Sequence, residues 1–174
     1  MSLPKLVVFD LDYTIWPFLV TTDIYPPFRK SVDSSSNPSK ITIKDSRGTS
    51  VSTFPDITQI LNHLKNELNI PCAVASRAGA MIRARDLLKL FEIDDFFINK
   101  QIYPQKKTNH FCFFRDELNF DPKDCLFFDD EIRNHHDLKP MGVFCVLVSQ
   151  EDGVTWELYK KALEDFKAKS ISEV

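Results

Sequence analysis

Residues 5–14 read KLVVFDLDYT, an apolar run that ends directly at two aspartates and a threonine. The apolar residues do not alternate with polar ones and are too few for a helix, which favours a strand over residues 5–9 that is buried on both faces. Ligands bind beyond the carboxyl ends of strands in open parallel sheets, and Asp10 falls at that position. Asp10 and Asp12 would repel each other there unless a cation or a proton compensated their charge. The alternative is a strand that ends in an ordinary Asx-type turn.

The length and composition of the chain favour one domain over residues 1–174, because 174 residues with 43% hydrophobic content can bury one good core. The net charge of −3, with no basic block longer than two residues, argues against nucleic acid or an anionic membrane as a partner. The sequence contains neither an apolar run of signal length nor one approaching ~20 residues. Its four cysteines form no C-x-x-C pair and are expected to be reduced. Together these features predict a cytoplasmic protein, most simply a monomer.

Strands and helices are predicted to alternate along most of the chain. Apolar segments typical of buried strands also occur at residues 71–75, 95–98, 126–128 and 143–148, and helical spacing of apolar residues occurs over 55–68, 84–91, 111–118 and 156–166. Short links between such elements imply right-handed crossovers. The expected fold is therefore α/β, a three-layer α/β/α, Rossmann-like arrangement around a mostly parallel sheet.

The segment from residue 15 to residue 54 interrupts this alternation, and we call it the flap. It begins with an aromatic and proline-rich stretch that suits a loop, and the serine-rich residues 34–39 are typical of a mobile tip. Residues 41–43 and 51–53 alternate apolar and polar side chains on either side of a glycine-containing turn, which predicts a small β-hairpin. No segment is long enough to form a separate cap domain.

The pattern Asp-x-Asp-x-Thr at residues 10–14 is identical to the first signature of the haloacid dehalogenase superfamily of phosphoryl-transfer enzymes. Asp10 is then expected to be the nucleophile, since a carboxylate can attack phosphorus in line and form an aspartyl phosphate. Asp12 would protonate the leaving oxygen and later activate water. Thr14 would hydrogen-bond near Asp12 and orient it.

Polar residues beyond the later strands could complete a metal site. Asp10, the backbone carbonyl of Asp12 and the Asp130 carboxylate would bind Mg²⁺ through hard oxygen ligands, and Asn134 could hold a metal-bound water. Asp129 stands beside Asp130 in a supporting position. The alternative for this acid pair is a helix N-cap with an extra first-turn acid. Arg133 is expected at the surface or as a partner of Asp129. His135 is expected on the solvent side of the same helix, with a position at the rim of the site as the second possibility.

A second group of residues is expected to bind the phosphoryl oxygens. Ser76 follows the second strand and could donate to them together with the backbone N–H groups of Leu11 and Arg77. A lysine would pair with the nucleophile and the phosphate, and Lys107 is favoured over Lys106 because it heads a predicted helix. The alternatives are a helix-capping role for Ser76 and a solvated Arg77 side chain that contacts no phosphate. Two aromatic residues near the motif, Tyr13 and Trp16, are expected to pack in the flap, with substrate stacking as the second possibility.

Four segments together resemble the magnesium-dependent phosphatase group of the superfamily. They read KLVVFDLDYTIWPF at residues 5–18, VASR at 74–77, IYPQKK at 102–107 and FFDDEIRN at 127–134. The resemblance implies a capless HAD-like fold and Mg²⁺-dependent hydrolysis of phosphate monoesters, with phosphotyrosine proteins and sugar phosphates as substrate classes. The chain departs from the pattern in its serine-rich tip and in Asn134, where many members have a second acid.

Three other functions fit the sequence less well than hydrolysis does. A phosphate-sensing or scaffold protein would be phosphorylated on Asp10 with little turnover, but such a protein has no need for Asp12. A receiver domain carries its acid pair after the first strand and its acceptor aspartate after the third, which is not the order here. A mutase is disfavoured because it needs a cap to retain its intermediate.

Overall fold

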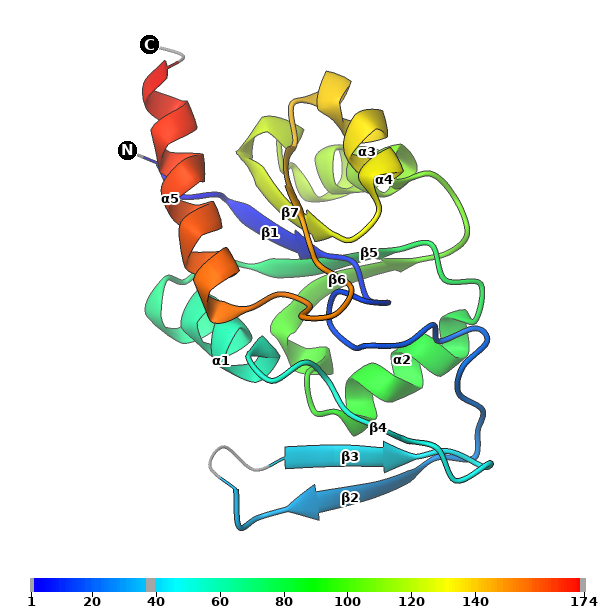
Figure 1. Cartoon of the computed structure of the whole chain (residues 1–174). Helices are drawn as coiled ribbons and strands as arrows, with labels where there is room; N and C mark the ends of the chain where they lie inside the picture. Colours follow the sequence, from blue (N-terminus) through cyan, green and yellow to red (C-terminus); the bar gives the residue numbers. More distant parts are fainter. Residues whose placement is uncertain (1, 37–39, 173–174) are drawn as a thin grey trace.

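The structure, a computed structural model, describes residues 2–36 and 40–172. A five-stranded sheet forms its centre, with the strand order β6-β5-β1-β7-β8 and every neighbouring pair parallel (Figure 1). The strands are β1 Leu6–Phe9, β5 Cys72–Ser76, β6 Phe97–Ile102, β7 Cys125–Asp129 and β8 Phe144–Leu147. Strand β1, which Asp10 directly follows, therefore lies at the middle of the sheet, where both faces can be covered.

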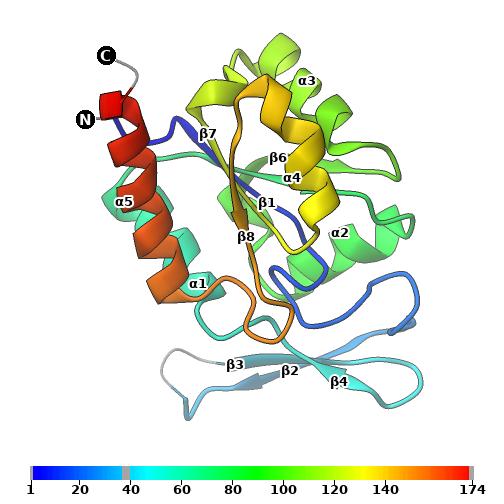
Figure 2. The same cartoon turned by 45° about the horizontal axis from the view of Figure 1, so that its top comes forward.

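Helices cover both faces of this sheet. The first face packs against three helices: α1 Ile57–Asn62, α2 Met81–Leu90 and α5 Trp156–Ser172. Helix α1 continues as a π-helical turn over His63–Glu67. The second face packs against α3 Lys107–Leu118 and α4 Ile132–Leu138. In Figure 2 α4 and α5 lie on opposite sides of β8. Alternate β1 side chains enter the two cores, Val7 and Phe9 on one face and Leu6 and Val8 on the other. The expected three-layer α/β/α fold is confirmed.

The third strand differs from its predicted position. The sequence predicts a strand over 95–98, whereas Asp94–Phe96 form a 3₁₀ turn and β6 runs from Phe97 to Ile102. β6 is an edge strand, so its Ile98 side chain remains 54% exposed while Gln101 is buried. An edge strand does not need a continuous apolar sequence, which is why composition alone placed it too early.

The flap forms a separate antiparallel sheet with the order β2-β3-β4, made of Arg29–Asp33, Lys40–Lys44 and Ser50–Val51. Figure 1 shows it beneath α2, at the opposite end of the molecule from the termini. The hairpin is thus present, but strand β2 was not predicted because all five of its residues are exposed. Of the predicted serine-rich tip, residues 34–36 form a turn and bend, and residues 37–39 lie outside the described part of the chain.

Two further features of the described residues concern the cysteines and the length of the helices. The four cysteines are free thiols, as expected for a protein without structural disulfides. Among the described helices, none has the length and apolar character required to cross a membrane.

Candidate active site

The candidate site lies at the carboxyl edge of the central sheet. Neighbouring strands β1, β5 and β7 end there, and the first turn of α3 contributes Lys107. A pocket of about 410 Å³ opens at this edge. Its lining includes most of the residues selected from the sequence: Asp10, Asp12, Ser76, Arg77, Lys107, Asp130 and Asn134. Residues separated by up to 124 positions in the chain thus face one cavity.

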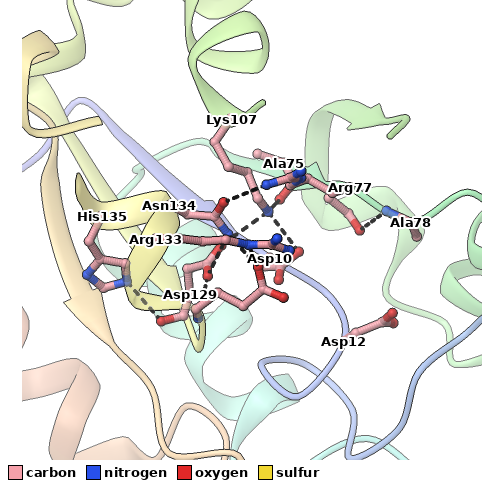
Figure 3. A network of polar contacts seen from close by, with 12 residues as sticks. Asp10, Asp12, Ala75, Arg77, Ala78, Lys107, Asp129, Arg133, Asn134 and His135 are labelled. Carbon is pink, nitrogen blue, oxygen red and sulfur yellow. Dashed lines mark hydrogen bonds and ion pairs between the residues drawn. The ribbon is translucent and has the colours of Figure 1, made fainter. Parts of the chain in front are cut away.

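Lys107 is the cation at the centre of the site. Its side chain is 1% exposed, and its Nζ lies 2.9 Å from Asp10 Oδ1 and 3.2 Å from Asp129 Oδ2. The same ammonium donates to the Ala75 carbonyl (Figure 3). Burial by itself would lower the pKa of Lys107, but Asp10 and Asp129 outweigh it and raise that pKa, so the lysine stays charged. Lys106, in contrast, is exposed and lies 3.9 Å from Asp137, outside the pocket.

Burial dominates the electrostatics of Asp10. It raises the pKa of Asp10 to about 8, and Asp129 adds to the increase, whereas Lys107 opposes it. Lys107 therefore does not fully offset the effects of burial and of Asp129 on the Asp10 carboxyl. A further cation beside Asp10 would favour the ionised form that a nucleophile requires.

The carboxylates present fit a divalent metal ion. One oxygen from each of Asp10, Asp129 and Asp130 lies within 4.8 Å of the other two. Such a set of hard oxygen donors suits Mg²⁺, which keeps part of its water shell. The Asp12 carboxylate is not part of this cluster, and the sequence had assigned to Asp12 only a backbone carbonyl ligand. Asp130 is further held by Gln150, whose Nε2 donates to its Oδ2 at 2.7 Å.

Asp129 is held more tightly than the sequence indicated. Asn134 Nδ2 donates to both of its carboxylate oxygens at 3.0 Å, and the Glu131 N–H donates to Oδ1 at 2.7 Å. Asn134 thus contacts Asp129 directly, a role that the expectation of a metal-bound water had missed. Arg77 extends this network, because its guanidinium lies 3.4 Å from Asn134 Oδ1.

Three alternatives that the sequence left open for this part of the chain are excluded. Helix α4 has Glu131 at its N-cap with no side-chain cap, so neither Asp129 nor Asp130 serves as the N-cap. Arg133 pairs with Glu131 at 2.6 Å and not with Asp129. His135 does not line the pocket, and its Nε2 lies 3.0 Å from the Asp129 carbonyl oxygen.

Asp12 lies apart from the Lys107 cluster, on the flap side of the pocket (Figure 3). Its Oδ1 accepts hydrogen bonds from Trp16 Nε1 at 2.8 Å and from the Val20 N–H at 3.2 Å. Burial raises the pKa of Asp12 to about 6, although these two donors oppose the increase. A carboxyl group that titrates near neutral pH can both donate and accept a proton.

The residues that orient Asp12 differ from the expectation. The Thr14 hydroxyl is buried and makes no hydrogen bond within the described residues, so the expected contact to Asp12 is wrong. Trp16 does pack inside the flap, where it stacks on Phe18, yet its indole N–H also holds Asp12. The proximity of Trp16 to Asp12 in sequence was a usable signal, whereas nothing in the sequence indicated Val20.

Ser76 is buried at the end of β5 and faces the pocket. Its Oγ accepts a hydrogen bond from the Ala78 N–H at 3.2 Å, which leaves the hydroxyl hydrogen for another acceptor. Helix α2 has Ala80 at its N-cap with no side-chain cap, so Ser76 does not cap it. The expected backbone donors, the N–H groups of Leu11 and Arg77, bond to no other described residue.

The fold and the site define a class of protein. A parallel sheet with an Asp-x-Asp-x-Thr turn after its central strand, a buried lysine and a late acid pair is the arrangement expected for the haloacid dehalogenase superfamily. The model of the Acid Phosphatase family matches residues 2–169, and the chain belongs to this family. It is a phosphatase of the haloacid dehalogenase type.

Individual relatives agree with this assignment. The human protein named Magnesium-dependent phosphatase 1 is 38% identical over 164 residues, which cover 94% of this chain and 88% of the human protein. A HAD-like hydrolase superfamily protein of Schizosaccharomyces pombe is 35% identical over 152 residues, or 82% of this chain and 84% of that protein.

Solved structures share the fold. A HAD-superfamily hydrolase from Ehrlichia chaffeensis has a TM-score of 0.62 and 15% identity, with 97% of this chain and 98% of that chain covered. The N-terminal part of a Bacteroides fragilis protein, which contains a phosphatase domain complexed with Mg, has a TM-score of 0.64 and 19% identity. That match covers 92% of this chain and 40% of the other.

Proposed function

We propose that this chain is a Mg²⁺-dependent phosphatase that hydrolyses phosphate monoesters through an aspartyl phosphate on Asp10. One observation carries the proposal: carboxylate oxygens of Asp10 and Asp130 lie within 4.8 Å of each other, beside the buried ammonium of Lys107. A nucleophile, a cation-binding acid and a phosphate-compensating charge thus meet at one point. The name of the human relative and the bound Mg of the Bacteroides fragilis domain support the choice of metal.

Two chemical steps follow from this arrangement. In the first, an Asp10 oxygen forms a bond to phosphorus, the bond from phosphorus to the leaving oxygen breaks, and Asp12 donates its proton to that oxygen. In the second, Asp12 takes a proton from a water molecule that attacks the same phosphorus. The bond between Asp10 and phosphorus then breaks, which releases inorganic phosphate and restores both aspartates.

The surrounding residues are assigned supporting roles. Ser76 and the N–H groups of Leu11 and Arg77 donate to the phosphoryl oxygens, while Lys107 compensates their charge. Asp10, Asp130 and the Asp12 carbonyl would hold Mg²⁺, which neutralises the carboxylates and the phosphoryl group when bound. Asn134 keeps Asp129 in place, and Asp129 in turn helps to fix Lys107.

The substrate is proposed to be a phosphorylated protein side chain, phosphotyrosine above all, or a small sugar phosphate. Apart from the flap, no cap covers the pocket within the described residues, and exposed Leu19 stands at its rim. A screen of phosphopeptides and sugar phosphates, with Mg²⁺ and with EDTA, distinguishes these classes. Activity on every substrate that persists in EDTA would refute the metal requirement.

The proposal is tested by replacing the two aspartates. Asp10→Asn is expected to abolish hydrolysis of 4-nitrophenyl phosphate, because an amide is not a nucleophile here, while the circular dichroism spectrum stays unchanged. Asp12→Asn should lower turnover by about 10²- to 10⁴-fold, the usual contribution of a general acid or base. An Asp10→Asn protein that retains activity would end the proposal.

A further inference from the structure

One arginine of α2 is bonded to the backbone of the flap at three points. Arg83 Nη1 donates to the carbonyl oxygens of Val20, Thr21 and Ile24 at 2.9, 3.1 and 2.7 Å. Its guanidinium also lies 4.8 Å from the ring centre of Tyr25. We call residues 19–25 the flap loop.

Arg83 does not stabilise its own helix, α2, from the position that it occupies there. Helix α2 starts at Met81, so Arg83 lies in the first turn, where the partial positive charge of the helix disfavours a cation. The three carbonyl groups provide the compensating negative partial charges. The contact with the flap loop therefore accounts for an arginine at this position, and helix stability does not.

The flap loop forms one wall of the candidate active site. Leu19 and Thr21 line the catalytic pocket, and the buried Val20 between them contacts Asp12. The two polar backbone groups of Val20 point to different partners: its carbonyl oxygen accepts from Arg83, and its N–H donates to Asp12 Oδ1 at 3.2 Å. A single residue thus connects the arginine with the carboxyl group.

We propose that Arg83 is a positioning residue for hydrolysis, which fixes the flap loop so that the Val20 N–H holds the Asp12 carboxyl against the leaving oxygen. The inference rests on the proposed role of Asp12 as the general acid. Arg83 does not line the catalytic pocket, and its effect on Asp12 passes through the flap loop to the Val20 N–H. Loss of Arg83 should loosen this loop and displace the Asp12 carboxyl. Proton donation by Asp12 should then become slower, while the nucleophile Asp10 stays in place.

This role makes a distinctive kinetic prediction. An alkyl phosphate has a poor leaving group that needs a proton, whereas 4-nitrophenolate leaves without one. With enzyme in excess over substrate, the assay follows only cleavage of the ester bond. Under this condition Arg83→Gln should lower the cleavage rate of an alkyl phosphate about tenfold and that of 4-nitrophenyl phosphate less than about twofold. A purely structural role would slow both substrates by the same factor.

Matched variants complete the experiment. Arg85 lies on the same helix and donates to the Lys100 carbonyl at 2.9 Å, outside the pocket, so Arg85→Gln should change neither rate. Arg83→Lys keeps the charge but has a shorter reach, and an intermediate, still selective loss is expected. This variant also decides the question if Arg83→Gln does not fold, as judged by its thermal unfolding.

The outcomes separate this inference from the proposed function. Asp12→Asn should show the same preference for 4-nitrophenyl phosphate, only more strongly. If Asp12→Asn discriminates between the substrates but the Arg83 variants slow both equally or neither, the positioning role is refuted and the proposed function survives. If Asp12→Asn itself does not discriminate, the proposed acid role of Asp12 fails.

Discussion

The two aspartates of the Asp-x-Asp-x-Thr turn are held by different parts of the molecule. Asp10 lies against the central sheet and pairs with the buried cation Lys107, which also binds Asp129. Asp12 is held by two neutral N–H donors that both come from the flap. We call these the framework side and the flap side of the site. The framework side supplies a compensating charge, whereas the flap side supplies neutral hydrogen-bond donors, and the two sides should respond differently to substitution.

The largest effect is expected on the framework side. Lys107→Met keeps the length of the side chain but leaves Asp10 and Asp129 buried without their cation. Removing one partner of a buried ion pair costs about 3–5 kcal/mol of unfolding free energy, and loss of a phosphate-compensating charge lowers turnover about 10²- to 10³-fold. Urea unfolding and phosphatase assays measure the two losses.

The adjacent lysine provides the control for this prediction. Lys106 is exposed and lies 3.9 Å from Asp137, so Lys106→Met should change the unfolding free energy by less than about 1 kcal/mol. Equal losses for the two variants would show that the buried position of Lys107 does not matter.

A smaller effect is expected one helical turn further along α3, at His110. Its ring is fully buried, neither nitrogen has a hydrogen-bond partner among the described residues, and it packs edge-on against Tyr103 with ring centres 4.2 Å apart. Burial, with the charge of Lys107, lowers the pKa of His110 from 6.5 to about 3. The unfolded chain therefore binds a proton below pH 6.5 that the folded protein excludes, and folding loses stability as pH falls through that value.

His110→Phe tests this linkage while it keeps an aromatic ring beside Tyr103. Between pH 7.5 and pH 5.5 the wild-type protein should lose about 1.4 kcal/mol of unfolding free energy relative to the variant. Urea unfolding of both proteins at the two pH values measures the difference, in which titration of the active-site carboxylates cancels. Parallel pH dependences would mean that His110 is protonated in the folded protein.

On the flap side, replacement of Trp16 should shift the pH dependence of the reaction. Trp16→Phe preserves an aromatic ring to stack on Phe18 but removes the indole N–H that donates to Asp12. That donor lowers the pKa of Asp12 from the level that burial alone would set, so its removal should raise the pKa above about 6. A hydrogen bond to a charged group contributes on the order of 1.5 kcal/mol, which corresponds to roughly one pKa unit. In the variant, Asp12 should therefore stay protonated, and cleavage of an alkyl phosphate should stay fast, up to a pH roughly one unit higher than in the wild-type protein.

The pH profile of ester-bond cleavage in the wild-type and Trp16→Phe proteins measures this shift. Cleavage of 4-nitrophenyl phosphate is the internal control, since it depends little on a proton donor. A shift to lower pH would contradict the assignment of Trp16 as a donor to the Asp12 carboxylate.

The framework side could be predicted from the sequence, because each of its parts has a local signature. Strands β1 and β7 are apolar on both faces and end at acids, and Lys107 heads a helix with regular apolar spacing. These features follow from chain-local rules on burial and on helix starts. The order of the elements then places their ends at one edge of the sheet.

The flap side could not be predicted in the same way. The exposed strand β2 has no apolar alternation, and the contacts of Val20 and Arg83 join residues 63 positions apart through backbone carbonyls that carry no sequence information. Thr14 shows the opposite limit: the motif suggested a hydrogen bond from its hydroxyl to Asp12, whereas the hydroxyl bonds to none of the residues that the structure describes. The orientation of the Asp12 carboxyl depends on tertiary contacts, which cannot be inferred from the composition of the chain or the spacing of its residues.

The smallest effect is expected where the flap sheet meets the body through surface charge. Lys30 of β2 pairs with Glu92, which follows α2, but the Glu92 side chain is 65% exposed. An exposed ion pair contributes about 0–1 kcal/mol, so Lys30→Gln should leave both the unfolding free energy and the selectivity between alkyl and aryl phosphates nearly unchanged. The flap is instead held by buried side chains such as Ile24, Ile43 and Phe54, and by Arg83. If Lys30→Gln altered the selectivity as much as Arg83→Gln, the flap sheet as a whole, and not the flap loop, would set the position of Asp12.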